Sequence, residues 1–354
     1  MGDSRGEGAA QRTPGRVVRL VAGVGLSIAL VVAAALYGWF QRTARFTGSE
    51  FAMDTLITVT VYGPQAEENG RAALAEFQRL DRQLSAYSAT SDLGRVNAAA
   101  GRQAVRVSRE TVDLVALALR YAALSDGRFD PTVGPLVRLW AIGNGRHEPP
   151  SPEEVDAARR LVDYRRVMVD VPGRRLYLPE RGMALDLGAV AKGYAAGRAA
   201  DLLRRRGVKS ALIDAGGNIV ALGARPNGRP WRVGLRHPRK PGAILGILTV
   251  VDRAVVTSGD YERYFEFGGR RYHHILDPAT GYPAKGAQSA TVVASSSTLA
   301  DILSTTVFIL GRTRGEAFAR QHGAATIFVD AAGKVSVAPE LATAWTPVGT
   351  GSAT

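Results

Sequence analysis

The sequence predicts an α+β fold in which antiparallel sheets are packed by helices, preceded by one N-terminal transmembrane helix. Two observations predict the folded part: hairpin-like strands separated by Gly or Pro turns fill the middle of the chain, and amphipathic helical segments flank them. A third observation, an uncharged apolar run near the N-terminus, predicts the membrane helix. With 354 residues and 46% hydrophobic content, the chain can bury one large or two modest cores.

The N-terminal segment predicts where the protein is located. Residues 1–19 form a basic, cytoplasmic tail, and the uncharged run of residues 20–40 follows. As a helix this run would span roughly 30 Å, the thickness of a bilayer core, and its basic side should stay in the cytoplasm. We therefore expect a single-pass anchor in the cytoplasmic (inner) membrane with an extracytoplasmic, periplasmic domain. A cleaved signal peptide is the alternative, because residues 33–35 resemble a small-residue cleavage site.

Composition narrows the classes of partner. The net charge is +13, which suits an anionic ligand or an acidic membrane surface. The arginines are scattered and no basic run is interleaved with aromatic residues, so we expect no nucleic-acid partner. Cysteine is absent, which excludes disulfides and thiolate metal sites.

Periodicity predicts the elements of the folded domain, placed at residues 46–345. Alternating apolar and polar residues over 51–63 predict an opening strand. Helical spacing of apolar residues predicts helices over about 65–84 and 108–125, and Gly207 and Gly311 should end two later ones. These later helices are expected at 189–206 and 299–310, a short helix should be capped by Ser151, and hairpin-like strands should lie at 165–179, 183–190, 210–223 and 230–238. Residues 346–354 are expected to form a flexible tail.

Two helix starts could carry chemistry. A strand should end at Asp186 and a helix begin around Ala189, where free N–H groups and Lys192 would attract a phosphate. The alternative is a plain strand-turn-helix joint. Further along, Asp301 and Thr305 are four residues apart and share one helix face, so their oxygens could hold Mg²⁺. The alternative there is a capping box formed by Thr298 and Asp301.

The segment HHILDPATGYP, residues 273–283, is the most concentrated group of chemical functions in the chain. Its two prolines and Thr280-Gly281 predict a shaped loop after a strand, and such loops carry function more often than packing. A Pro turn with solvated histidines is the alternative. The preceding stretch VVTSGDYERYF places a turn at Ser258 to Tyr261 between strands.

Taken in order, these segments resemble the ApbE family, the FAD:protein FMN transferases. The resemblance covers about residues 51–338. It rests on MDT at 53–55, SAYS at 85–88, DGRFDPTVGPLVRLW at 126–140, DLGAVAKGYA at 186–195, IDAGGNI at 213–219, TSGDYERYF at 257–265, HILDPATGYP at 274–283 and DILSTT at 301–306. Because eight motifs occur in the same order, the resemblance is specific.

The resemblance implies a T-fold-related α+β domain that transfers the FMN moiety of FAD to a Thr or Ser hydroxyl of a target protein, with Mg²⁺, and releases AMP. An extracytoplasmic redox-protein subunit is the expected flavin acceptor. The implied FAD contacts are Met53, Tyr87, Arg128, Phe129, Asp130, Asp186, Lys192 and His274. The implied Mg²⁺ ligands are the Ala189 carbonyl, Asp301, Thr305 and Ser304.

This chemistry would need a general base, because a hydroxyl is a poor nucleophile at neutral pH. His274 is the candidate catalytic residue, since an imidazole titrates near neutrality and this one lies in a loop, whereas His273 should point to the other side of its strand. Two alternatives stay open. One is a Mg²⁺-dependent FAD pyrophosphatase that gives FMN and AMP, and the other is an FAD-binding protein without turnover.

Overall fold

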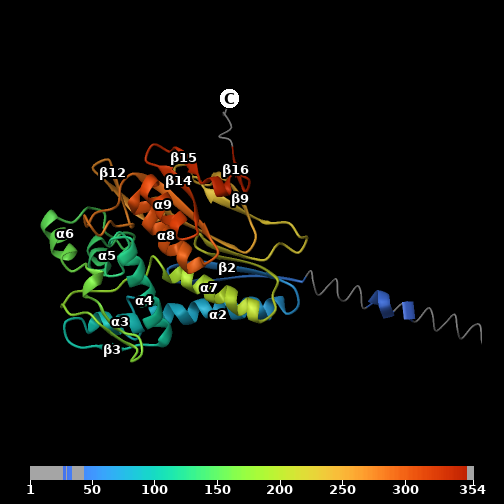
Figure 1. Cartoon of the computed structure of the whole chain (residues 1–354), viewed down its shortest axis with the longest axis horizontal. Helices are drawn as coiled ribbons and strands as arrows, with labels where there is room; N and C mark the ends of the chain where they lie inside the picture. The colour runs from blue at the N-terminus through green and yellow to red at the C-terminus, as the bar shows by residue number, and fades with distance from the viewer. Residues whose placement is uncertain (1–26, 29, 34–43, 349–354) are drawn as a thin grey trace, which may run out of the picture.

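The computed structural model describes residues 27–28, 30–33 and 44–348 of the chain (Figure 1). Of the predicted membrane helix at residues 20–40, six residues are described, and they are helical. The rest of that prediction, and the tail of residues 1–19, lie outside the described residues. Within the described ranges, no helix combines the length and the apolar character that a membrane span requires.

An eight-stranded antiparallel sheet forms the centre of the domain, in the order β1-β2-β6-β7-β10-β13-β14-β15. Its strands are β1 (Arg45–Ala52), β2 (Thr55–Tyr62), β6 (Ser210–Ala215), β7 (Asn218–Leu222), β10 (Arg253–Gly259), β13 (Ala287–Ala294), β14 (Ala325–Asp330) and β15 (Val335–Val337). Consecutive strands pair as hairpins at β1-β2, β6-β7 and β14-β15. The predicted α+β class with antiparallel pairing is therefore confirmed.

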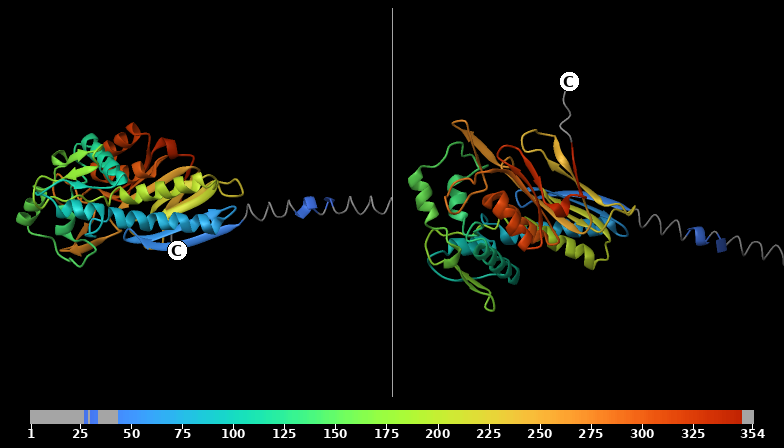
Figure 2. Two further views of the ribbon diagram at one scale, coloured as in Figure 1. Left: turned by 90° about the horizontal axis from the view of Figure 1, so that it is seen from below. Right: turned by 45° about the horizontal axis from the view of Figure 1, so that its top comes forward.

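Both faces of this sheet are covered, and the domain has three layers. Helices α2 (Ala66–Leu84), α7 (Ala191–Arg205) and α8 (Ser297–Leu310) lie side by side on one face, as Figure 2 shows. A three-stranded sheet of β8 (Trp231–Arg236), β9 (Ile244–Val250) and β16 (Trp345–Pro347) covers the other. Along β10, Ala254 and Val256 face the helices while Val255 faces the small sheet. Because successive side chains point to opposite faces, such a strand is apolar throughout and does not alternate.

The remaining elements gather mainly at one end of the sheet (left in Figure 1). They are α3 (Asp92–Ala98), α4 (Arg109–Leu124), α5 (Gly134–Trp140), α6 (Pro152–Arg159), the small sheet of β3 (Val105–Arg106), β5 (Arg175–Tyr177) and β4 (Met168–Asp170), and the hairpin of β11 (Tyr264–Phe267) and β12 (Arg270–His273). Helix α9 (Arg312–Gln321) follows α8 directly. The predicted cap at Ser151 is confirmed, since its hydroxyl accepts a hydrogen bond from the Glu154 N–H in a capping box.

The strand predicted at 183–190 is wrong. Residues 183–190 form no strand, although Met183, Leu185 and Leu187 are buried as a strand would bury them. Their backbone pairs with a side chain instead, because the Asn97 amide donates to the Leu185 carbonyl (2.9 Å) and accepts from the Leu185 N–H (2.8 Å). A single bridge from Ala184 to Val133 is all that resembles sheet pairing there. The helix that follows begins at Ala191, two residues later than expected.

The predicted flexible tail begins too early. Thr346 and Pro347 were placed in it, but they pair with Ile247 and Gly246 of β9 as part of β16. The physical reason is Trp345, which anchors this strand by packing against the core beneath the small sheet. Residues 349–354 of the predicted tail lie outside the described residues.

Candidate functional site

A cleft of about 820 Å³ opens where the β1-β2 turn, the N-terminal end of α7, one side of α8 and several loops meet. Apart from Ser304, the cleft is lined by every site residue predicted from the sequence: Met53, Tyr87, Arg128, Phe129, Asp130, Asp186, Ala189, Lys192, His274, Asp301 and Thr305. These residues come from segments far apart in the chain. A cleft of this size can hold a dinucleotide-sized ligand.

The two-residue turn between β1 and β2 forms one lip of the cleft. Met53 and Asp54 both have positive φ angles, 52° and 61°, as a type I′ hairpin turn requires. The single strand predicted over 51–63 is therefore wrong, because the turn divides it between β1 and β2; Asp54 suits such a turn, but Met53 does not and hid it in the apolar pattern. The Asp54 carboxylate accepts a hydrogen bond from Arg263 at 2.9 Å, which joins the lip to the segment between β10 and β11.

The loop of residues 126–133 forms the facing wall. Phe129 is buried, and the Arg128 guanidinium lies 3.2 Å from the Asp277 carboxylate, which ties this loop to the one after β12. Asp130 does not present its carboxylate freely. One oxygen accepts from the Thr132 N–H and hydroxyl (2.8 and 2.6 Å), the other from the Tyr164 N–H (3.1 Å), and burial raises the pKa of the carboxyl. Its geometry is that of a residue that shapes the loop.

The SAYS segment after α2 brings an aromatic ring to the cleft. The Ser85 hydroxyl accepts hydrogen bonds from the N–H groups of Tyr87 (3.2 Å) and Ser88 (3.3 Å), which folds the segment into a tight turn. This turn leaves Tyr87 71% exposed at the cleft, so most of its ring is available to a ligand.

The start of α7 supplies a cation and polar backbone groups. The Asp186 carboxylate accepts a hydrogen bond from the Gly188 N–H at 2.7 Å. This Asx turn reverses the chain just before the helix. The Lys192 ammonium donates to the Gly188 carbonyl at 3.2 Å. The first N–H groups of α7 are largely used within the protein, since Ala191 donates to the Leu187 carbonyl at 2.8 Å and Gly193 to the Asp301 carboxylate at 2.7 Å, so Lys192 is the group here that can attract a phosphate.

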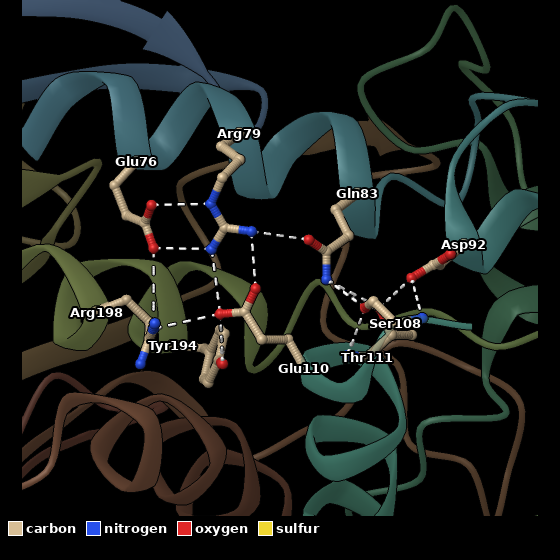
Figure 3. A network of polar contacts seen from close by, with 9 residues as sticks. All are labelled: Glu76, Arg79, Gln83, Asp92, Ser108, Glu110, Thr111, Tyr194 and Arg198. Atoms are coloured by element: carbon tan, nitrogen blue, oxygen red, sulfur yellow. Dashed lines mark hydrogen bonds and ion pairs between the residues drawn. The ribbon is translucent and has the colours of Figure 1, made fainter. Parts of the chain in front are cut away.

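A polar network holds α7 in this position (Figure 3). Arg79 of α2 donates to Glu76 on its own helix and to Glu110 of α4, and Glu110 accepts from the Tyr194 hydroxyl of α7 at 3.1 Å. Burial, followed by the nearby Glu110 charge, raises the pKa of Tyr194 to about 12, so this hydroxyl remains a donor at every physiological pH. The three helices behind the cleft are thereby linked through Arg79 and Glu110.

Asp301 of α8 is 4% exposed and faces α7. Its Oδ2 accepts a hydrogen bond from the Gly193 N–H at 2.7 Å. The capping-box interpretation is wrong, because Ser296 caps α8 by accepting from the Leu299 N–H. Thr305, one turn further along, reaches the same cleft. Ser304 does not line it: its fully buried hydroxyl donates to the Asp301 carbonyl at 2.9 Å.

These residues fit a hard divalent cation. Asp301, the Thr305 hydroxyl and the Ala189 carbonyl are all oxygen donors at one cleft, and Mg²⁺ takes few protein oxygens, leaving other positions to water and phosphate. Within the described ranges, no group of three or more His, Cys, Asp or Glu side chains is placed to hold a metal.

We predict that Gly193→Ala will damage the cleft. An added Cβ at position 193 would lie 2.4 Å from the Ser297 carbonyl oxygen and 2.5 Å from the Asp301 Cβ, so α8 must shift. Such overpacking costs about 1–3 kcal/mol, which exceeds the gain in helix propensity. Gly197→Ala is the matched control, since its Cβ would meet nothing nearer than 3.7 Å. Chemical denaturation should show a loss of stability for the first variant and none for the second; equal stabilities would contradict the packing argument.

The side chains of the adjacent residues His273 and His274 point to different places, as predicted: only His274 lines the cleft. His273 is buried, where its Nε2–H donates to the Ala284 carbonyl (2.9 Å) and its Nδ1 accepts from the Ile275 N–H (3.3 Å). His274 is half-buried in the cleft wall, and its Nδ1 lies 3.3 Å from the Arg263 carbonyl. Because a carbonyl can only accept, Nδ1 carries the proton and Nε2 carries the free lone pair. His274 therefore has the tautomer that a base needs.

Burial, followed by the positive charge of Arg263 and, more weakly, that of Lys192, lowers the pKa of His274 to about 3. The ring is thus neutral in the folded protein at any physiological pH. In the unfolded chain it takes up a proton below about pH 6.5, so unfolding becomes easier as the pH falls through that value.

We predict that this linkage is visible in acid stability. Between pH 7 and 5 the wild-type chain should lose up to about 2 kcal/mol more stability than His274→Gln, which has no proton to gain on unfolding. Urea unfolding at both pH values measures the difference. A loss that is the same in both proteins would mean that His274 is not held neutral.

The sequence did not identify two residues that complete the cleft wall. Arg263 binds Asp54 and holds His274 through its carbonyl, and Asp277 pairs with Arg128. Both lie inside motifs that the sequence did single out, but the partner of each is more than 140 residues away, and no local pattern reveals such a pairing.

Comparison with known proteins agrees with this geometry. The ApbE family profile matches residues 53–328. An FAD:protein FMN transferase of Treponema pallidum is 37% identical over 327 residues, covering 86% of this chain and 90% of that protein, and one of Klebsiella pneumoniae is 41% identical over 248 residues, covering 70% and 77%.

Solved structures of ApbE proteins have a similar fold. The ApbE protein of Thermotoga maritima has a TM-score of 0.79 and 33% identity, covering 85% of this chain and 99% of its own. The apo flavinyl transferase ApbE of Pseudomonas stutzeri has a TM-score of 0.73 and 35% identity, covering 84% and 96%. The matched residues span the β1-β2 turn, the start of α7, the loop after β12 and α8, which are the segments that build the cleft. The chain belongs to the ApbE family.

Proposed function

We infer that this chain is an FAD:protein FMN transferase, an enzyme that moves the FMN part of FAD onto a hydroxyl of a protein. The observation that carries the inference is the meeting of three functions in one cleft. Lys192 attracts phosphate, Asp301 with Thr305 offers cation ligands, and His274 offers a neutral base. The transferases of Treponema pallidum and Klebsiella pneumoniae carry this activity in their names.

The reaction assigns a task to each group. The oxygen of a Thr or Ser hydroxyl attacks the flavin-side phosphorus of FAD, the bond from that phosphorus to the bridging oxygen breaks, and AMP leaves. The hydroxyl proton passes to Nε2 of His274. Lys192, in the first turn of α7, stabilises the negative charge that grows on the phosphate oxygens.

We propose that Mg²⁺ binds at Asp301, Thr305 and the Ala189 carbonyl. The ion would supply Lewis-acid stabilisation of the pyrophosphate. The support is the donor set itself, one carboxylate, one hydroxyl and one carbonyl at the same cleft. Ser304 is left out of the ligand set, because its hydroxyl is buried beneath the cleft.

The remaining FAD contacts are proposed by position. Tyr87 and Met53 would meet the isoalloxazine or adenine ring at the outer lip, and Phe129 would close the apolar part of the cleft. Arg128, Asp130 and Asp186 would act mainly by fixing the walls, since each already has a protein partner.

We also propose that residues 20–40 anchor the chain in the cytoplasmic membrane and that the domain acts on an extracytoplasmic redox-protein subunit. The support is the uncharged run behind a basic tail. Fractionation of cells that express the full chain, followed by intact-mass measurement, tests this. A full-length protein in the membrane fraction is expected, whereas a chain that starts near residue 36 would favour the signal peptide.

A stoichiometry experiment tests the proposed activity. The purified chain is incubated with FAD and Mg²⁺, with and without a candidate acceptor, and AMP is quantified. Transfer predicts AMP in proportion to labelled acceptor and little AMP without it. AMP and FMN released equally in both samples would favour the pyrophosphatase, and bound FAD without AMP in either would favour a non-catalytic flavin-binding protein.

A further inference from the structure

Ser258, at the end of β10, has no role in the account above, yet it lines the cleft beside the proposed cation ligands. Its hydroxyl oxygen lies 2.9 Å from the hydroxyl of Ser304 and 3.3 Å from that of Thr305. The Ser304 hydroxyl in turn lies 2.9 Å from the main-chain carbonyl of Asp301. Three hydroxyl groups therefore form one chain that starts at the cleft and ends at a carbonyl.

The direction of every proton in this chain follows from its end. A carbonyl can only accept, so Ser304 donates its single proton to Asp301. The bond between Ser258 and Ser304 then needs the proton of Ser258. With that proton used, Ser258 can only accept from Thr305. The Thr305 hydroxyl then directs its proton at Ser258, and the lone pairs of its oxygen are left for a ligand in the cleft.

A hydroxyl in this state is suited to a cation, which needs a lone pair, and is unsuited to donating toward a phosphate. We propose that Ser258 is a positioning residue that turns the Thr305 hydroxyl into an obligatory acceptor and so prepares it as a cation ligand. This inference rests on the proposed function of the same site. It also gives the buried Ser304 its place, as the link that sets the proton direction rather than a ligand.

The structure offers a matched control on the same helix. Thr306 is fully buried and its hydroxyl donates to the Ile302 carbonyl at 2.8 Å, within α8 and outside the chain of three. Thr306→Val removes a buried hydroxyl next to Thr305 without touching Ser258. Ser258→Thr keeps the hydroxyl and suits a strand residue, so it should restore what Ser258→Ala loses.

The test is Mn²⁺ binding to the full-length protein, measured by the loss of the free-ion paramagnetic resonance signal, with FAD present and no acceptor protein. We expect Ser258→Ala to weaken Mn²⁺ binding about 10–100-fold, as loss of a residue that orients a ligand does. Ser258→Thr and Thr306→Val should bind as the wild type does. FAD affinity without metal, followed by flavin fluorescence, should stay unchanged in all four proteins.

Two results would overturn the proposal, and they differ. Suppose that Ser258→Ala binds Mn²⁺ as tightly as the wild type. The direction of the Thr305 hydroxyl proton then has no effect on metal binding, so the role of Ser258 is wrong, but the metal site is still supported. If the wild type binds no Mn²⁺, or Asp301→Asn binds as well as the wild type, the metal site itself is wrong and the role of Ser258 falls with it. Thermal unfolding of each variant excludes misfolding as the cause.

Discussion

His274→Ala is expected to bind FAD and to lose most flavin transfer, by a factor of about 10² to 10⁴. The reason is that the variant lacks the neutral Nε2 that takes the acceptor's proton, while the walls that hold the dinucleotide remain. The Arg263 carbonyl, which fixes the tautomer of His274, stays in place in the variant. Single-turnover labelling of an acceptor and flavin fluorescence titration measure the two quantities separately.

Binding of FAD should also change the pKa of His274. In the protein without FAD, desolvation lowers the pKa of His274 most, and the charges of Arg263 and Lys192 add to the effect. A bound pyrophosphate would neutralise those charges, so the pKa should rise toward the range in which a base works best. His273→Gln is the control, because His273 lies outside the cleft. An unchanged transfer rate in His274→Ala would remove the base assignment.

Asp301→Asn is expected to abolish Mg²⁺-dependent transfer, with a loss of at least about 10² to 10³ in rate. Asparagine retains an oxygen that can accept from the Gly193 N–H, so the contact between α7 and α8 survives. The negative charge that a cation requires is lost. Steady-state transfer over a range of Mg²⁺ concentrations measures the effect.

The comparison with Asp301→Ala makes this result interpretable. Alanine removes the charge and also the acceptor for Gly193, so it should lower stability as well as activity. If Asp301→Asn kept the wild-type rate and Mg²⁺ dependence while Asp301→Ala lost stability, the carboxylate would be a structural link between the helices and no metal ligand.

The sequence predicted α2, α4, α6, α7 and α8 and the β6-β7 hairpin because their signals are local, whereas the short helices α3, α5 and α9 and the β1-β2 hairpin were not predicted. Gly311 ends α8 with a φ of 76°, and helix α2 matches the predicted span to within one residue. The failed strand at 183–190 shows the limit. Its apolar residues are buried, but the partner of the Leu185 backbone is the amide of Asn97, which lies 88 residues away and has no periodic signature.

The residues of the candidate site were predicted from the order of the family motifs along the chain, because spacing and composition alone did not identify them. Composition and spacing left Asp301 undecided between a cap and a ligand, and the structure excludes the cap because Ser296 already fills that position. Ser304 could not be separated from Thr305 by sequence, since they are neighbours on one helix and differ only in the direction they face. The proton direction at Ser258 depends on a strand and a helix that meet only in the folded chain.

Covalent transfer of FMN to a protein is tested most directly by the mass of the acceptor. Purified full-length chain, FAD, Mg²⁺ and a candidate redox subunit are incubated, and the denatured acceptor is measured by intact mass spectrometry, beside an acceptor whose target Thr is replaced by Val. We expect one covalent FMN on the first acceptor, one AMP released for each label, and no label on the second. AMP release with no change in acceptor mass would contradict covalent transfer.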